Sequence, residues 1–186
     1  MWAKIRTTAW EIIKFVIVVL VIVIPIRTYI AQPFVVSGAS MYPTFDNSEY
    51  LIVDEISYRF QEPARGDVIV FEYPRDHRLH FIKRIIGLPG EIVKIEGNKV
   101  TIDDGTKKFD LVENYVTEAF NANFETKLLP GEYFVMGDNR SVSLDSRAWG
   151  PLTRDLITGR VIFRLFPPNK INYLPGHEKI QSDSRN

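Results

Sequence analysis

The stretch VIVFEYPRDHRLHFIKRII, residues 68–86, decides the fold class. Its two halves, 68–73 and 79–86, are rich in the β-branched and aromatic side chains that strands favour. The triplet Pro-Arg-Asp at 74–76 separates the halves, and proline beside aspartate marks a turn. Two extended runs around such a turn predict a β-hairpin.

Shorter runs of the same kind continue the β pattern on both sides of this hairpin. One pair flanks Gly97-Asn98, a strong signal for a two-residue hairpin turn. Strands are expected at 35–36, 50–54, 93–96, 99–102, 133–136 and 160–166. Short strands at this spacing predict a mostly β, barrel-like domain of several sheets. Residues 103–128 carry few strand signals and have the character of an insertion.

The N-terminus predicts a membrane anchor. An unbroken apolar run covers residues 15–26, and the wider stretch 10–30 would form a helix of about 31 Å, long enough to cross a bilayer. Lys14 and Arg27 lie near its two ends, where lysine and arginine reach the headgroup layers. We therefore expect residues 1–31 to form a short stub and one transmembrane helix, followed by a domain at 32–186.

The flanking charges predict the orientation of that anchor. Residues 1–30 hold four basic side chains and one acidic one, and the basic excess precedes the apolar run. By the positive-inside rule the N-terminus is cytoplasmic and the domain at 32–186 is extracytoplasmic. A cleaved signal peptide and a buried helix of a soluble domain are the alternatives. Cleavage directly after the run is disfavoured, because Tyr29 is too large for the small-x-small pattern.

Composition narrows the chemistry. The chain of 186 residues has no cysteine, which excludes a thiol nucleophile and a disulfide framework. Its three histidines, His77, His80 and His177, fit neither a Ser-His-Asp arrangement nor metal-ligand spacing. The formal net charge is zero, so nothing favours a nucleic-acid partner. A serine enzyme here would need another base, and lysine is the available residue type.

Ser40 and Lys83 are the candidate nucleophile and base. Ser40 stands in SGASMYPT, residues 37–44, beside a turn that would expose it. Strand alternation places Lys83 on one face with Phe81 and Ile85, where burial lowers the pKa of the amine. At an ordinary pKa only on the order of one lysine in a thousand is neutral near pH 7.4, so this lowering is what makes a usable base. A lysine reaching solvent from a hairpin is the alternative.

A third segment, GDNRSVSLDSR at residues 137–147, is strongly polar. Such a cluster is buried only if its members satisfy one another. We expect charge-assisted pairs of Asp138 with Arg140 and of Asp145 with Arg147. Ser143 offers a hydroxyl that could orient a neutral lysine amine. A surface turn rich in caps and a metal site built on Asp138, Asn139 and Asp145 are the alternatives.

The three segments, in this order after one N-terminal span, resemble the conserved boxes of the type I signal peptidases. The resemblance extends to RGDVIVF at 65–71 and DSRAWG at 145–150. It implies a serine endopeptidase in which Ser40 is the nucleophile, Lys83 the general base, Ser143 the lysine-orienting hydroxyl, and Asp145 with Arg147 the supporting ion pair. It implies a mostly β catalytic domain with a small β extension, here at about 92–128. One span and a short extension resemble the smaller bacterial, cyanobacterial and plastid enzymes.

The substrate expected from this reading is an exported preprotein, bound as an added strand. The rims would be Val36, Ser37 and Gly38 on one side and Phe81, Ile82 and Lys83 on the other, with Met41 and Ile82 as walls of shallow pockets for small side chains. Gly38 replaces a serine that joins the oxyanion hole in some members of the family, and Phe81 replaces a common tyrosine. No metal or organic cofactor is needed.

Two other readings remain open from the sequence. A self-cleaving serine–lysine protease of the SOS-repressor type would be soluble and carry a DNA-binding domain. A membrane-anchored β domain that binds envelope partners would leave Ser40 and Lys83 unexplained. The distance between these two side chains separates an enzyme from a binding module, because a base must reach its nucleophile.

Overall fold

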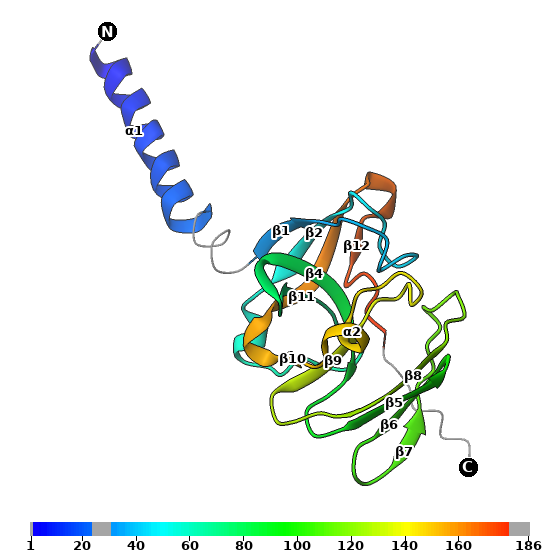
Figure 1. Ribbon diagram of the computed structural model, residues 1–186. Coiled ribbons are helices and arrows are strands. Elements are labelled where there is room, and N and C mark those ends of the chain that lie inside the picture. The colour runs from blue at the N-terminus through cyan, green and yellow to red at the C-terminus, as the bar shows by residue number, and fades with distance from the viewer. Residues whose placement is uncertain (1, 24–30, 179–186) are drawn as a thin grey trace.

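The β domain consists of two sheets (Figure 1). The computed structural model describes residues 2–23 and 31–178. The larger sheet runs in the order β1-β2-β11-β3-β4-β9-β10, with β12 paired to β11. Its strands are β1 (Ala31–Val35), β2 (Tyr50–Asp54), β3 (Val68–Tyr73), β4 (Asp76–Gly87), β9 (Glu132–Met136), β10 (Leu152–Thr153), β11 (Ile157–Phe166) and β12 (Asn172–Tyr173). The predicted mostly β, multi-sheet architecture is confirmed, although within the described residues this sheet has two free ends, β1 and β10, and does not close on itself.

The predicted hairpin at 68–86 is the centre of the larger sheet. Antiparallel β3 and β4 pair Ile69 with Lys83 and Phe71 with Phe81. β4 starts earlier than predicted, at Asp76, because its charged first residues still pair with the end of β3. The hairpin therefore holds Lys83 at a fixed register in the middle of the sheet.

The two faces of β4 pack against different hydrophobic cores. Ile82 packs against a core that includes Val36, Met41 and Val70, whereas Phe81 and Ile85 belong to a second core. The alternation predicted for β4 is thus confirmed. Lys83 lies between two large apolar side chains of its own face, which accounts for its burial.

The β extension predicted at about 92–128, called the insertion from here on, forms the smaller sheet in the order β7-β6-β5-β8. Its strands are β5 (Ile92–Gly97), β6 (Lys99–Asp103), β7 (Lys108–Asp110) and β8 (Ala122–Lys127). The Gly97-Asn98 turn joins β5 to β6 as predicted, with Gly97 at a φ of 64°, where glycine is favoured. A third core joins both sheets, because Val93 and Ile95 of β5 pack with Ile86 of β4 and Phe134 of β9.

Helical structure lies mainly at the N-terminus, apart from the sheets (Figure 1). Helix α1 (Trp2–Val18) continues into a π-helical segment, Val19–Val23. In the part of the chain that the structure describes, no helix has both the length and the hydropathy needed to cross a membrane. Residues 24–30, which belong to the predicted span at 10–30, and residues 179–186 of the predicted catalytic domain lie outside the described residues. Short helical elements of the β domain are α2 (Ser146–Trp149) and the 3-10 turns Ser57–Arg59, Arg154–Leu156 and Pro168–Lys170.

Candidate active site

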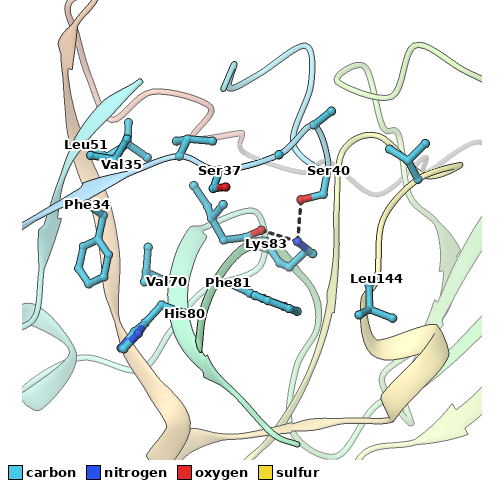
Figure 2. A pocket seen from close by; sticks show the side chains of 15 residues that line it. Phe34, Val35, Ser37, Ser40, Leu51, Val70, His80, Phe81, Lys83 and Leu144 are labelled. Atoms are coloured by element: carbon cyan, nitrogen blue, oxygen red, sulfur yellow. Dashed lines mark hydrogen bonds between the residues drawn. The ribbon is translucent and has the colours of Figure 1, made fainter. Parts of the chain in front are cut away.

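Lys83 and Ser40 meet at the floor of a cleft (Figure 2). The Lys83 ammonium nitrogen, Nζ, lies 2.7 Å from Ser40 Oγ and 2.8 Å from the carbonyl oxygen of Ile82, and donates to both. Nζ also lies 5.3 Å from the centre of the Phe81 ring. Two residues that are 43 positions apart in sequence are therefore within proton-transfer distance.

Burial sets the protonation of Lys83. The residue is only 4% exposed, and removal of its amine from water lowers the pKa of Lys83 to about 8. The negative charges of Asp145 and Asp138 act in the opposite direction and raise that pKa. At pH 7 about one amine in ten is thus neutral, compared with fewer than one in a thousand at the ordinary lysine pKa, and a neutral amine can accept the Ser40 proton.

The loop that follows β1 presents Ser40. Gly38 has a φ of 95°, a conformation that side chains other than glycine rarely adopt, and its N–H donates to Asn47 Oδ1 at 2.9 Å. The Ser40 carbonyl accepts the N–H of Asn139 at 3.0 Å. Among the described residues no acceptor takes the Ser40 N–H, which leaves this donor available at the reacting centre.

Residues 137–147, here named the catalytic loop, pack against Ser40. Gly137 has no room for a side chain, because a Cβ there would clash with the Ser40 carbonyl oxygen and with Ser143 Oγ. The Gly137 N–H donates to Ser143 Oγ and to Asp145 Oδ2, each at 3.1 Å. Gly137 and the Asn139 N–H are therefore two points at which the catalytic loop contacts the Ser40 carbonyl.

The predicted pair of Asp145 and Arg147 is confirmed. The guanidinium of Arg147 donates to both carboxylate oxygens of Asp145 at 2.8 Å, and Asp145 is fully buried. The same carboxylate accepts the backbone N–H of Arg147 and so caps α2. The Asp145 carboxylate therefore accepts hydrogen bonds from three groups, which are the Arg147 guanidinium, the Arg147 N–H and the Gly137 N–H.

The predicted pair of Asp138 and Arg140 is wrong. Asp138 binds Arg84 through two hydrogen bonds, at 2.8 and 2.6 Å, and both side chains are completely buried. Arg140 instead binds Glu113 of the insertion, at 3.0 and 2.5 Å. Each of the two side chains therefore pairs with a partner distant in sequence, Arg84 for Asp138 and Glu113 for Arg140.

Ser143 lies beside the dyad without a hydrogen bond to it in the described structure. Its hydroxyl accepts the Gly137 N–H, and Lys83 Nζ bonds to Ser40 and to the Ile82 carbonyl. The lysine-orienting role of Ser143 stays a prediction.

The cleft has a volume of about 420 Å³ and is mostly apolar. The predicted rim residues Val36, Ser37, Gly38, Phe81 and Ile82 all line it, together with Ser40 and Lys83. Met41 differs from expectation, since it is buried in the core next to Val36 and is not among the lining residues. Sequence reasoning did not find the other lining residues, which are Phe34, Val35, Ala39, Leu51, Val70, His80, Val142 and Leu144.

Comparison with known proteins identifies the family of the chain. Residues 9–166 match the family described as signal peptidase, peptidase S26. The chain belongs to this family. It is 37% identical over 173 residues to a probable signal peptidase I-1 of Synechocystis, covering 87% of this chain and 86% of that protein. It is 34% identical to the thylakoidal processing peptidase 1 of Arabidopsis thaliana, covering 82% of this chain and 47% of that protein. A crystal structure of a signal peptidase I from Enterococcus faecalis is 32% identical, with a TM-score of 0.47 over 54% of this chain and 97% of that one.

Family membership makes the chain a peptide-bond hydrolase. Two residues important for the site, Arg84 and Gly137, were not singled out from the sequence. Arg84 follows Lys83 directly, and its position on the opposite face of β4 was the available signal. Nothing local to Gly137 indicates that a Cβ would meet Ser40, because that contact arises only in the folded chain.

Proposed function

We propose that this protein is a serine endopeptidase that removes signal peptides from exported preproteins, with Ser40 as nucleophile and Lys83 as general base. The observation that carries the proposal is the 2.7 Å contact between Lys83 Nζ and Ser40 Oγ inside an apolar cleft. The family match and the relatives named as signal peptidases support the substrate class. Burial of a lysine against a serine costs free energy, and a binding module would gain nothing from it.

The open edge of β4 supports substrate binding by strand addition. β9 pairs with β4 only at Arg84, Ile85 and Gly87, so within the described residues the edge of Phe81–Lys83 that faces the cleft has no strand partner. The opposite rim is the segment from Val36 to Gly38, which follows β1 and also lines the cleft. An extended peptide laid between these rims would hydrogen-bond to both and place its side chains alternately into the cleft.

The proposed reaction uses the neutral amine twice. Lys83 accepts the proton of Ser40 as Oγ attacks the scissile carbonyl carbon, and the Ser40 N–H donates to the developing oxyanion. Lys83 then protonates the amine of the leaving mature protein, which leaves an ester on Ser40. In the second half Lys83 accepts a proton from water as the water oxygen attacks the ester carbonyl. Lys83 then returns that proton to Ser40 Oγ as the ester bond breaks, which releases the signal peptide and restores the neutral amine.

Attachment to the membrane completes the proposal. We assign residues 10–30 to one transmembrane anchor, with the N-terminus cytoplasmic, the β domain extracytoplasmic and membrane lipid as a partner. Apolar side chains of α1, such as Trp10, Phe15 and Ile17, are more than half exposed, and a helix that is apolar on several sides needs an apolar environment. A bacterial plasma membrane fits best, and a thylakoid membrane is the alternative that the plant relative raises.

Cleavage of a preprotein tests the catalytic assignment. Ser40→Ala and Lys83→Ala are each expected to fall to below about 0.1% of the wild-type rate, the scale seen when a nucleophile or base is removed. Lys94→Ala is the matched control, because Lys94 is a solvent-accessible lysine on β5 paired with Glu96. Wild-type cleavage by either dyad variant would refute the assignment.

The absence of native cysteine allows a clean test of topology. Asn98→Cys, in the exposed β5–β6 turn, should react with a membrane-impermeant maleimide added outside intact cells. Thr7→Cys should react only after the membrane is permeabilised. The reverse labelling pattern would refute the proposed orientation.

A further inference from the structure

The insertion makes unusually polar contacts with the catalytic loop. Its segment 113–120, here named the docking segment, lies between β7 and β8 of the smaller sheet. Glu113 forms a double hydrogen bond with Arg140, whose side chain is completely buried. The Tyr115 hydroxyl donates to the same Glu113 carboxylate at 2.7 Å. Simple packing of a surface extension needs neither a buried arginine nor a carboxylate with three donors.

Aromatic rings of the docking segment lie against three arginines near the site. Phe120 lies under two of them, with its ring centre 5.3 Å from the Arg140 guanidinium carbon and 5.5 Å from that of Arg147. Tyr115 lies 3.9 Å from the guanidinium carbon of Arg84, the residue after the catalytic lysine. Stacking of this kind fixes the plane of a guanidinium and therefore the direction of its hydrogen bonds.

Hydrogen bonds connect Arg140 and Arg147 to the parts of the catalytic loop that lie next to Ser40 and Lys83. Arg140 Nε donates to the Gly137 carbonyl at 2.9 Å, and Arg147 Nη2 donates to the Arg140 carbonyl at 2.8 Å. Gly137 in turn touches Ser40, and Arg147 holds Asp145, whose charge acts on Lys83. A continuous path of contacts thus runs from the docking segment through the catalytic loop to both members of the dyad.

We propose that Phe120 and Glu113 of the docking segment are positioning residues, which hold Arg140 and Arg147 so that the catalytic loop keeps Ser40 aligned with Lys83. The inference rests on the proposed function, because its readout is preprotein cleavage. Neither residue lines the cleft, so loss of either should slow the chemical step more than it weakens substrate binding.

The test compares two phenylalanines of the insertion, Phe120 of the docking segment and Phe109 of β7. Phe109, like Phe120, is partly buried against the shared core and lies under two cations, but these are Arg65 and Lys107, which do not belong to the catalytic loop. Phe120→Leu should lower kcat about tenfold with KM within about twofold, because each cation–ring contact is modest. Phe120→Tyr, which keeps the ring, should restore kcat. Phe109→Leu should leave kcat unchanged, whatever its effect on the melting temperature.

The outcomes separate the inference from the proposed function. Unchanged kcat in Phe120→Leu, or kcat lowered equally in both leucine variants in step with their melting temperatures, would overturn the positioning role. Glu113→Gln, which keeps the size of the side chain and removes its charge, gives a second test with the same expected fall in kcat if Phe120→Leu does not fold. If the wild-type protein itself fails to cleave preproteins, the proposed function fails, which is a different result.

Discussion

Lys83 gives the protein a functional group at a cost in stability. Burial lowers the pKa of Lys83 from its ordinary value of 10.5 to about 8 in the folded state. Between these two values the unfolded chain binds more protons than the folded chain, so stability rises with pH across that window. Below about pH 8 the full cost is present, and the pKa difference corresponds to roughly 3 kcal/mol.

Lys83→Met should therefore stabilise the fold while it removes activity. Methionine has similar length and flexibility and carries no charge to bury. We expect a gain of up to about 3 kcal/mol in the free energy of unfolding at pH 7, which shrinks as the pH rises from 8 to 10.5. Chemical denaturation at several pH values measures it, with Lys94→Met, a change at a partly exposed lysine, as the control. A gain that does not depend on pH would contradict the explanation by burial of charge.

The same protonation should govern the rate. Because the reaction needs neutral Lys83, kcat/KM should rise with pH through a midpoint of about 8 and then level off. Steady-state cleavage of a peptide substrate between pH 6 and 10 measures this limb. A midpoint near the ordinary lysine value would show that the amine is solvated in the working enzyme.

At the scale of single residues, the sequence was sufficient to predict the environment of Lys83 but not the partners of Asp138 and Arg140. Strand alternation predicted its face and its burial, because both follow from the period of the strand alone. The partners of Asp138 and Arg140 could not be predicted in the same way. They come from β4 and from the insertion, and only the folded chain brings these segments to the catalytic loop.

At the scale of elements, the catalytic loop and α2 behave as one unit around Asp145. This carboxylate pairs with Arg147, caps α2 and accepts the Gly137 N–H. Removal of one member of such a pair leaves an arginine whose charge is partly buried and uncompensated.

Asp145→Asn should loosen this unit and alter the pH profile. We expect a loss of about 3 kcal/mol in the free energy of unfolding and a lower cleavage rate. Since the Asp145 charge raises the pKa of Lys83, the midpoint of the residual activity should move to lower pH. Thermal melting and pH–rate profiles measure both effects.

Ser143→Ala provides the contrast within the same loop. It removes one acceptor of the Gly137 N–H, while Asp145 still accepts that donor. Stability should fall by less than about 1 kcal/mol. If the rate nevertheless falls strongly, the hydroxyl acts on Lys83 during the reaction. A melting temperature as low as that of Asp145→Asn would instead identify Ser143 as a structural cap.

Elements differ in how well the sequence predicts them. β2 and β3 match their predicted bounds, since each is a run of apolar and β-branched residues. β7 and β8, in contrast, lie within the insertion, where alternating polar residues such as those of Ala122–Lys127 give little local signal. These strands form because β6 and β5 offer them edges to pair with.

At the scale of the whole molecule, one buried ion pair joins segments from across the chain. Arg84 of β4 binds Asp138 of the catalytic loop and the carbonyl of Gly66 before β3, and Thr44 Oγ1 donates to Asp138 from the loop that carries Ser40. The Arg84 guanidinium also donates to the carbonyl of Gly176 near the end of the described chain and stacks on Tyr115. The larger sheet, the loop that carries Ser40, the catalytic loop, the docking segment and the C-terminal segment therefore share one charged centre.

Asp138→Asn should consequently destabilise the entire β domain and not only the catalytic loop. Loss of the carboxylate leaves the Arg84 guanidinium charged and completely buried, which costs about 3–5 kcal/mol. Asp76→Asn is the matched control, because its pair with Arg78 forms on the surface and should leave the melting temperature unchanged. Hydrogen exchange resolves the extent of the effect. Faster exchange spread over β4, β6 and β11 together would show a shared centre, whereas faster exchange confined to residues 137–147 would show that Arg84 and Asp138 stabilise the loop alone.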